Sequence, residues 1–223
     1  MRDYQIGIVS EGPRDFDMLN EIIIHMLGEN VRFLPLQPDL SATPGFGSFG
    51  AGWHGVRDWC QSIAEQGGLE LLVNGVQGLD LLIIQLDGDV AREPDVNCFK
   101  GCPPAEDTVK ELENWLLSYL KQPLPNKVIF IIPMDNLEAW VLAAYHKQHQ
   151  LAPLHFECMN KPDELLTQSP YKLLKRKNNG KPNKTAKKYR DSLIPLVIEM
   201  WSDVTATCSQ ADKLDKNIKA LMV

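Results

Sequence analysis

The sequence predicts an α/β fold, with a mostly parallel sheet that carries helices on both faces and a helical C-terminal extension. Apolar runs of strand length alternate with segments of helical periodicity through the first 150 residues, and this alternation predicts a parallel sheet. The runs at residues 80–86 and 127–132 are almost wholly apolar, as in strands buried on both faces. We expect residues 1–150 to form the α/β domain and residues 151–223 to pack on it as a lysine-rich extension.

The first strand is expected over residues 4–10 and the first helix over residues 13–27. Pro13 suits the first position of a helix, and Gly28 ends the run of helical spacing. A second strand at residues 31–36 contains a proline, which cannot donate a ladder hydrogen bond and therefore favours the edge of the sheet. The glycine-rich stretch that follows, residues 38–55, lacks a nucleotide-binding fingerprint and is expected to be a connector.

The remaining elements follow from the same periodicities. Apolar residues that recur every three to four positions predict helices, and continuous apolar runs predict strands. The expected elements are a helix at 53–64, strands at 80–86 and 127–132, a helix ending near residue 120, and a helix at 135–145. Helical candidates in the extension cover residues 163–166, 171–175, 185–201 and 210–221.

The chain has no run of 18 apolar residues, and its first residues enter a strand without a signal-peptide pattern. We therefore expect a soluble, cytoplasmic protein with no membrane partner. Its five cysteines are odd in number and scattered, which favours reduced structural thiols over a disulfide framework. Cys98 and Cys102 have the spacing of two zinc ligands, but no second pair accompanies them.

Carboxylates follow two of the predicted strands directly. Glu11 comes after the first strand, and Asp87 and Asp89 come after the strand at residues 80–86. The carboxyl ends of parallel strands lie at one edge of a sheet, so these acids meet there if the two strands are neighbours. Alternate residues of an extended segment point the same way, so Asp87 and Asp89 can converge on a cation, with Gly88 leaving room for it. The alternative is an ordinary Asp-Gly turn.

Clustered carboxylates need a compensating positive charge. Two unpaired carboxylates about 4 Å apart repel by roughly 4 kcal/mol at an effective dielectric constant near 20. Oxygen ligands without a nearby histidine or cysteine favour Mg²⁺ or Mn²⁺ over zinc. Because such an ion activates water and neutralises charge on a phosphoryl group, the acids indicate chemistry on phosphate esters.

A basic segment interrupts this acidic chain. Residues 171–190 contain nine Lys or Arg and no Asp or Glu; removing these nine charges from the net charge of −6 leaves −15 on the rest. The concentration predicts a polyanion contact confined to one region. No base-reading motif is present, so we expect backbone-led binding, with Tyr171 and Tyr189 as candidates for base stacking. The candidate nucleic-acid-binding residues are Lys172, Lys175, Arg176, Lys177, Lys181, Lys184, Lys187, Lys188 and Arg190.

The order of these motifs resembles the Toprim domain, the metal-binding fold of topoisomerases, primases and several nucleases. Residues 11–15, Glu-Gly-Pro-Arg-Asp, are similar to the start of Toprim nucleases of the OLD (overcoming lysogenisation defect) type. Residues 132–143, followed by Lys184-Thr185, resemble small stand-alone Toprim-like proteins, some of whose relatives act in bacterial antiphage defence. The resemblance covers residues 4–143 for the fold and extends more loosely to residue 190.

The resemblance implies roles for individual acids. Glu11 would be a metal ligand or general acid/base, and Asp87 and Asp89 would be the main metal ligands. Asp15, one helical turn beyond Glu11, would join a second metal site, although an acid in the first turn of a helix is also favoured by the helix dipole. Glu138 is assigned from its position: it follows a predicted strand and so lies at the same sheet edge, where we expect it to face the site as a further ligand, although it also has capping-box spacing from the acid at position 135.

A lysine close to the metal ligands would stabilise the transition state. Lys184 is the candidate because Lys184-Thr185 matches the family pattern best, with Lys181 and Lys187 as the neighbouring candidates.

These observations predict a Mg²⁺- or Mn²⁺-dependent nuclease acting on DNA or RNA, with a toxin-like defence role and a regulatory partner such as an ATPase by analogy alone. One alternative is a non-catalytic Toprim module that binds nucleic acid or a partner protein. The other is a haloacid-dehalogenase-type phosphatase with Asp87 as nucleophile. The motif of that class normally lies near the start of its fold, and this alternative leaves Glu11 and Gly12 unexplained.

Overall fold

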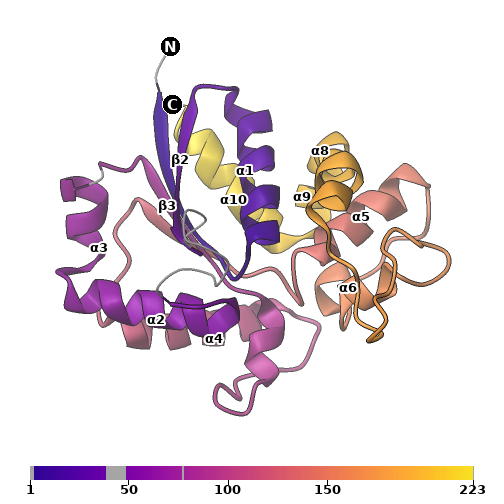
Figure 1. The fold of residues 1–223 in the computed structure, drawn as a ribbon, viewed down its shortest axis with the longest axis horizontal. Coiled ribbons are helices and arrows are strands. Elements are labelled where there is room, and N and C mark those ends of the chain that lie inside the picture. Colours follow the sequence, from indigo (N-terminus) through magenta and orange to yellow (C-terminus); the bar gives the residue numbers. More distant parts are fainter. Residues whose placement is uncertain (1–2, 39–48, 77, 223) are drawn as a thin grey trace.

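The apolar runs of the sequence become the strands of one parallel sheet. The computed structural model describes residues 3–38, 49–76 and 78–222, and these residues form four strands in the order β2-β1-β3-β4 (Figure 1). All three strand pairs are parallel. The strands are β1 (Tyr4–Val9), β2 (Val31–Gln37), β3 (Leu81–Gln85) and β4 (Val128–Ile131). The strand that contains Pro35 lies at an edge, as its missing N–H predicted.

Helices cover both faces of this sheet, so the fold class expected from the sequence is confirmed. Alternate residues of a strand point to opposite faces, and Ile83 and Ile84 of β3 accordingly belong to two different apolar cores. One core is covered by α1 (Pro13–Leu27), α5 (Glu138–Gln148), α8 (Ile194–Glu199), α9 (Trp201–Thr207) and α10 (Ser209–Ala220). The other is covered by α2 (Gly52–Glu65), α3 (Gly68–Glu70), a π-helical turn (Leu71–Val76) and α4 (Glu106–Leu120).

Local signals set the ends of α1. Pro13 occupies its first turn, where a missing N–H costs no hydrogen bond, and the helix ends at Gly28, whose φ of +80° suits glycine. The Gly28 N–H donates to the carbonyl of Ile24 over 2.8 Å. The helix therefore starts one short turn after β1, which places its N-terminus at the carboxyl edge of the sheet.

The C-terminal residues share the core of the sheet. Helix α10 lies next to α1, and the buried Gln210 side chain accepts a hydrogen bond from the Ile132 N–H over 3.0 Å, just beyond β4. The shorter elements of this region are a 3-10 helix (Phe156–Cys158), α6 (Pro162–Leu165), α7 (Ala186–Lys188) and a π-helical turn (Tyr189–Leu193). With α5, α8 and α9 they form the lobe on the right of Figure 1. No helix in the described part of the chain is long and apolar enough to cross a membrane.

The helix expected at residues 171–175 is absent. Lys172 has a φ of +49°, which a right-handed helix does not allow, and the chain continues into a hairpin-like turn instead. Two backbone bonds of 2.8 Å close this turn, from Asn183 N–H to the Lys175 carbonyl and from Lys177 N–H to the Lys181 carbonyl. The expected helix at 135–145 is present but begins at Glu138, and most of the glycine-rich connector, residues 39–48, lies outside the described residues.

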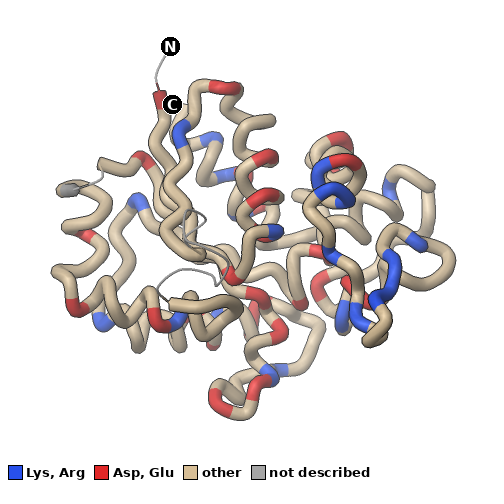
Figure 2. Tube along the Cα trace, viewed as in Figure 1, with Lys and Arg blue, Asp and Glu red and all other residues tan. Residues whose placement is uncertain are grey.

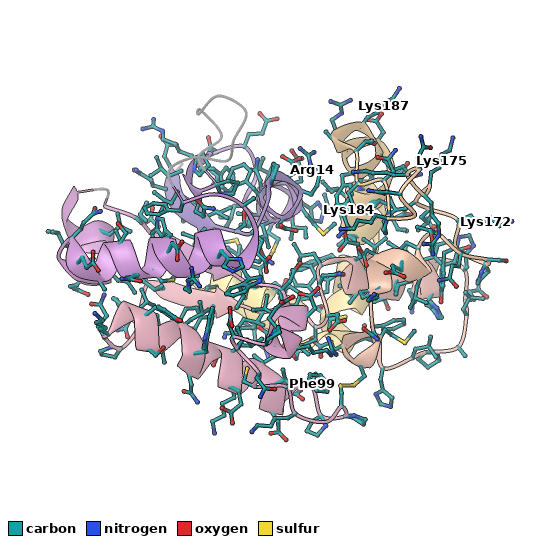
Figure 3. The ribbon with its side chains drawn as sticks, turned by 60° about the horizontal axis from the view of Figure 1, so that its bottom comes forward. Arg14, Phe99, Lys172, Lys175, Lys184 and Lys187 are labelled. Atoms are coloured by element: carbon teal, nitrogen blue, oxygen red, sulfur yellow. A yellow bond between two sulfur atoms is a disulfide. The ribbon has the colours of Figure 1, made fainter. Side chains whose placement is uncertain are left out.

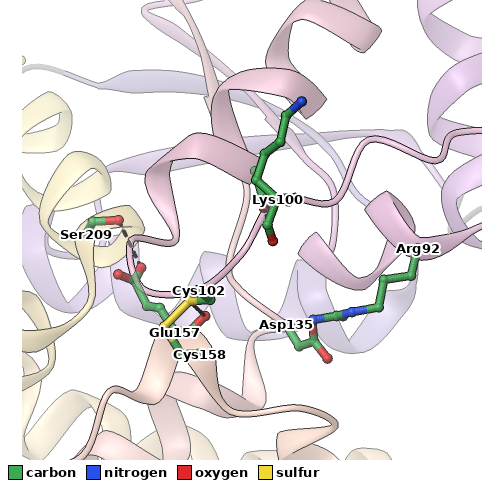
Figure 4. The surroundings of a disulfide bond; sticks show 8 residues. Arg92, Lys100, Cys102, Asp135, Glu157, Cys158 and Ser209 are labelled. Atoms are coloured by element: carbon green, nitrogen blue, oxygen red, sulfur yellow. Dashed lines mark hydrogen bonds and ion pairs between the residues drawn. A yellow bond between two sulfur atoms is a disulfide. The ribbon is translucent and has the colours of Figure 1, made fainter.

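Two of the cysteines form a disulfide, so the expectation of reduced thiols holds only for Cys60, Cys98 and Cys208. Cys102, in the loop before α4, is bonded to Cys158 in the C-terminal region (Figure 4). The disulfide therefore ties the α/β part of the chain to its C-terminal helices.

Candidate carboxylate and lysine site

The neighbouring positions of β1 and β3 bring Glu11 and Asp87 together. Val9 pairs with Ile84 in the parallel register, so the two chains leave the sheet side by side. The Asp87 N–H donates to Glu11 Oε1 over 2.7 Å, and the Glu11 N–H donates to Gln85 Oε1 over 3.2 Å. Gln85 Nε2 then donates to Asp87 Oδ1 over 2.8 Å. These three bonds fix the two carboxylates at the carboxyl edge of the sheet.

Gln85 is a site residue that the sequence analysis did not select. It is fully buried, and its side-chain amide holds both acid residues: the oxygen accepts from the Glu11 N–H and the NH2 group donates to Asp87. The available signal was a single polar side chain inside the apolar run at residues 81–86. A buried amide is expensive unless it is hydrogen-bonded, so a glutamine at the end of a buried strand indicates polar partners nearby.

Burial and the charges of neighbouring carboxylates raise the pKa values of these acids. Burial, followed by the charges of Asp15 and Asp89, raises the pKa of Glu11 to about 8, although the hydrogen bond from Asp87 opposes the shift. Burial and the Glu138 charge raise the pKa of Asp15 to about 7. The pKa of Asp87 is raised well above its ordinary value by burial and by the charge of Glu11. In each case the charge of a neighbouring carboxylate adds to the effect of burial, as expected for acids that lie close together.

Asp89 reaches this cluster in a different way from the one expected. Asp87 precedes a 3-10 helix (Gly88–Arg92), so Asp89 lies in a helical turn and the alternation of an extended strand does not apply. Asp89 is exposed at the rim, yet desolvation by the surrounding protein and the charge of Asp135 raise its pKa to about 6. Its charge also raises the pKa of Glu11, so the rim position still belongs to the same electrostatic cluster.

Gly88 serves packing rather than access for a cation. A Cβ at this position would lie 2.0 Å from the Met134 sulfur and 3.1 Å from the Met134 Cα. The Gly88 N–H donates to the Pro133 carbonyl over 2.9 Å, and the Asp89 N–H donates to the Asp135 carbonyl over the same distance. The chain after β3 is therefore pressed against the chain after β4, and only glycine fits between them.

Lys184 enters the site from the C-terminal region. Its Nζ lies 2.9 Å from Glu138 Oε1 and 3.2 Å from Asp163 Oδ2. Burial acts to lower the pKa of this lysine, but the charges of Glu138, Asp163 and Asp87 outweigh it and raise the pKa. Lys184 is therefore a cation at neutral pH, and its charge in turn lowers the pKa values of Glu11, Asp15 and Asp89.

Glu138 lies at the start of α5 and is almost fully buried, with 3% of its surface exposed. The same oxygen that pairs with Lys184 also accepts a hydrogen bond from the Tyr189 hydroxyl. Tyr189 is 2% exposed, so it is not available to stack on a base, and the stacking role expected for it is wrong. Its contact instead shows that Glu138 holds two residues of the basic segment in place.

The sequence predicts a capping role for Asp135, and the structure buries this residue, with 2% of its surface exposed. Its carboxylate pairs with Arg92 and also accepts a hydrogen bond of 3.0 Å from the Lys161 N–H. Figure 4 shows Arg92 reaching Asp135 from the turn after β3. Asp135 therefore joins three segments around the site.

The other predicted basic residues do not join Lys184. Figure 2 shows Lys and Arg gathered along the loops of the C-terminal lobe, away from the sheet. Lys188 is half-buried, and the remaining ones, Lys172, Lys175, Arg176, Lys177, Lys181, Lys187 and Arg190, are exposed. Tyr171 is half-buried, with its hydroxyl 2.7 Å from His146 Nε2. The two lysines considered beside Lys184, Lys181 and Lys187, form no ion pair with a described acid.

The donor set suits a hard divalent cation. Glu11, Asp15, Asp87 and Asp89 offer carboxylate oxygens alone, which Mg²⁺ and Mn²⁺ prefer. Burial, with the charges of neighbouring carboxylates, raises the pKa values of all four acids. Among residues 3–38, 49–76 and 78–222, no three Asp, Glu, His or Cys side chains are grouped tightly enough to enclose an ion as they stand. Glu138 is already engaged by Lys184 and Tyr189, so we place it beside the cation ligands rather than among them.

Comparisons with protein-family models, curated proteins and solved structures found no match for the chain. What this site does is therefore inferred from its own side chains.

Proposed function

We propose that the chain is a Mg²⁺- or Mn²⁺-dependent nuclease that hydrolyses phosphodiester bonds in DNA or RNA. The observation that carries the proposal is the set of acids at the carboxyl edge of the sheet, with Lys184 beside them. Burial and neighbouring carboxylates disfavour the ionisation of Glu11, Asp15 and Asp87, and the half-buried Lys184 only partly opposes the pKa shifts of Glu11 and Asp15. A divalent cation held by these acids would supply positive charge, lower the pKa of bound water and neutralise charge on a phosphate oxygen.

The residues of the chain divide the work of hydrolysis. Glu11, Asp87 and Asp89 would hold the cation, with Asp15 as a further ligand, and Glu11 would accept the proton of the attacking water. The water oxygen would bond to phosphorus as the bond to the leaving oxygen breaks, and the leaving oxygen would take up a proton from solvent water. Lys184, kept charged by Glu138 and Asp163, donates hydrogen bonds to the phosphate as negative charge develops.

The exposed basic residues of the C-terminal lobe support a nucleic-acid substrate. Lysines and arginines on a surface bind the phosphate backbone irrespective of base sequence. The resemblance to Toprim nucleases supports the same assignment. The toxin-like defence role, the cytoplasmic location and an ATPase partner are proposed on that resemblance alone.

The test is cleavage of plasmid, single-stranded DNA and tRNA with Mg²⁺, with Mn²⁺ and with chelator. The variants Asp87→Asn and Glu11→Gln keep side-chain size and hydrogen bonding but remove charge, and we expect each to lose about 100-fold or more of the activity. Asp107→Asn, an exposed acid at the start of α4, is the matched control and should cleave as the wild type does.

Equal cleavage by the wild type, Asp87→Asn and Glu11→Gln would show that the carboxylate site does not catalyse the cleavage. Metal-dependent binding without cleavage of any substrate would indicate a non-catalytic module. A phosphoenzyme trapped on Asp87 would indicate a phosphatase.

A further inference from the structure

We propose that a lysine-lined pocket in the C-terminal lobe, separate from the carboxylate site, binds the phosphate of a nucleotide. The pocket has a volume of about 350 Å³. Its wall includes Lys172, Lys175, Lys187 and Lys188, together with the hydroxyl residues Thr185 and Ser192. We call this cavity the lysine pocket.

The positive charge of the lysine pocket is not neutralised by the protein. Within the described parts of the chain, Lys172, Lys175 and Lys187 form no ion pair, and Lys188 Nζ donates only to the neutral Ser192 Oγ over 3.3 Å. The one acid in the wall, Asp191, is paired with Arg190 at 2.9 Å. Several unpaired ammonium groups around one cavity repel one another, and an anion in the cavity relieves that repulsion.

The backbone separates the lysine pocket from the carboxylate site. Asn183 and Thr185 line the pocket, whereas Lys184 between them pairs with Glu138 and Asp163. This is the alternation of an extended segment, and Thr185 has the matching φ of −78° and ψ of 144°. In Figure 3, Lys172, Lys175 and Lys187 lie on the outer side of the lobe, and Lys184 lies on the side toward α1. The two groups of lysines therefore serve different ligands or different parts of one ligand.

Local hydrogen bonds hold the wall of the lysine pocket in shape. The Asn183 N–H donates to the Lys175 carbonyl over 2.8 Å, which fixes two wall residues opposite each other. The Thr185 hydroxyl accepts from the Lys188 N–H over 3.3 Å and so ties two more together. Because the backbone is fixed before a ligand arrives, binding costs less ordering of the chain.

The chemistry of the wall selects a phosphorylated ligand that is larger than phosphate itself. Lysine ammonium groups donate charged hydrogen bonds to phosphate oxygens, and the Ser192 hydroxyl and the Asn183 amide can add neutral hydrogen bonds. The volume lies in the range of small-molecule sites, and Leu173 with the lysine stems gives an apolar surface for a base or sugar. The nucleotide is either free or one unit of a nucleic-acid strand; only the second source rests on the proposed nuclease function.

The test measures binding to the full chain without divalent cations, so that no cleavage is required. The probes are inorganic phosphate, adenosine, adenosine 5′-monophosphate and a single-stranded DNA dodecamer, each titrated by calorimetry. The variants are Lys175→Gln and Lys187→Gln, and the matched control is Lys110→Gln, an exposed lysine of α4 that does not line the pocket.

We expect the monophosphate or the dodecamer to bind, and Lys175→Gln and Lys187→Gln to weaken that binding about tenfold each. Lys110→Gln should bind the monophosphate as the wild type does, and adenosine should not bind. Binding of the monophosphate assigns the pocket to free nucleotide, and binding of the dodecamer alone assigns it to a strand. Wild-type affinity in both pocket variants, or equal binding of adenosine and its monophosphate, would overturn the proposal. If no substrate is cleaved but the monophosphate or the dodecamer still binds in a way that depends on Lys175 and Lys187, only the proposed nuclease activity is contradicted.

Discussion

At the scale of single residues, the site is governed by one lysine among several acids. Lys184 is two-thirds buried, with 33% of its side chain exposed, and it shares Glu138 Oε1 with Tyr189. The pairing keeps the lysine charged and keeps the Glu138 charge from standing alone in a buried place. Removing one partner of a buried pair leaves the other uncompensated, which costs more than the pair itself contributes.

We expect Lys184→Met to lower the free energy of unfolding by about 2 kcal/mol. Lys187→Met is the control, because that lysine is exposed and has no ion pair within the described residues; its effect should stay within about 0.5 kcal/mol. Urea unfolding gives both values. The double variant with Glu138→Gln should cost less than the two single changes together, and strict additivity would show that the pair is not coupled.

The raised pKa values of the acids predict how stability changes with pH. Glu11 and Asp15 have pKa values of about 8 and about 7 in the folded chain, whereas unfolded carboxyls titrate near pH ~4. Between these values the folded state binds more protons than the unfolded state, so the free energy of unfolding falls as pH rises from about 4 to 8 without divalent cation. Thermal unfolding in chelator should show Tm decreasing over this range.

Asp87→Asn should make that decrease smaller and raise Tm at pH 8, because it removes an acid whose own pKa is raised on folding and keeps the hydrogen bond from Gln85. Asp107→Asn should leave the slope unchanged. A wild-type Tm that rises toward pH 8 in chelator would contradict the picture of unneutralised acids.

At the scale of elements, the sequence carried enough information to predict the strands but not the hairpin of the C-terminal region. The apolar runs predicted β1, β3 and β4, and Pro35 predicted an edge position for β2, because both signals are local. The hairpin at residues 175–183 was missed, since its pairing joins residues eight positions apart and carries no periodic signal. The apolar residues around Lys172 imitate a helical pattern, but the left-handed conformation at that residue stops it.

Gly88, which follows β3, is a residue whose role the sequence did not predict. Its sequence context suggested space for an ion, whereas the structure uses it to let two chain segments touch. Gly88→Ala places a methyl group against the sulfur and Cα of Met134, and we expect a loss of about 2 kcal/mol in the free energy of unfolding. Gly101→Ala is the control, since a Cβ there meets nothing within 4 Å. Chemical denaturation should separate the two variants, and equal stabilities would mean that Met134 yields at little cost.

At the scale of the whole molecule, the candidate site depends on segments far apart in sequence. The meeting of Glu11 and Asp87 could be predicted, because parallel strands end at one edge and both acids follow strands directly. The contact of Tyr189 with Glu138 joins residues 51 positions apart, and no spacing rule predicts it. The C-terminal lobe therefore supplies the positively charged side chain of the site, Lys184, which pairs with the same glutamate. The packing of this lobe against the sheet sets the position of the Lys184 ammonium group.

The disulfide between Cys102 and Cys158 is one of the ties that hold this arrangement. It closes a loop with a sequence separation of 56, and the chain-entropy estimate for a loop of that length is about 4 kcal/mol of stabilisation. We therefore expect Cys102→Ser to lower the free energy of unfolding by about that amount in non-reducing urea titrations. Cys98→Ser is the control, because Cys98 is a free and half-buried thiol in the same loop. Added reductant should lower the free energy of unfolding of the wild type to that of Cys102→Ser and leave the variant unchanged. If reductant does not change the free energy of unfolding of the wild type, the disulfide does not stabilise the packing of the C-terminal helices on the sheet.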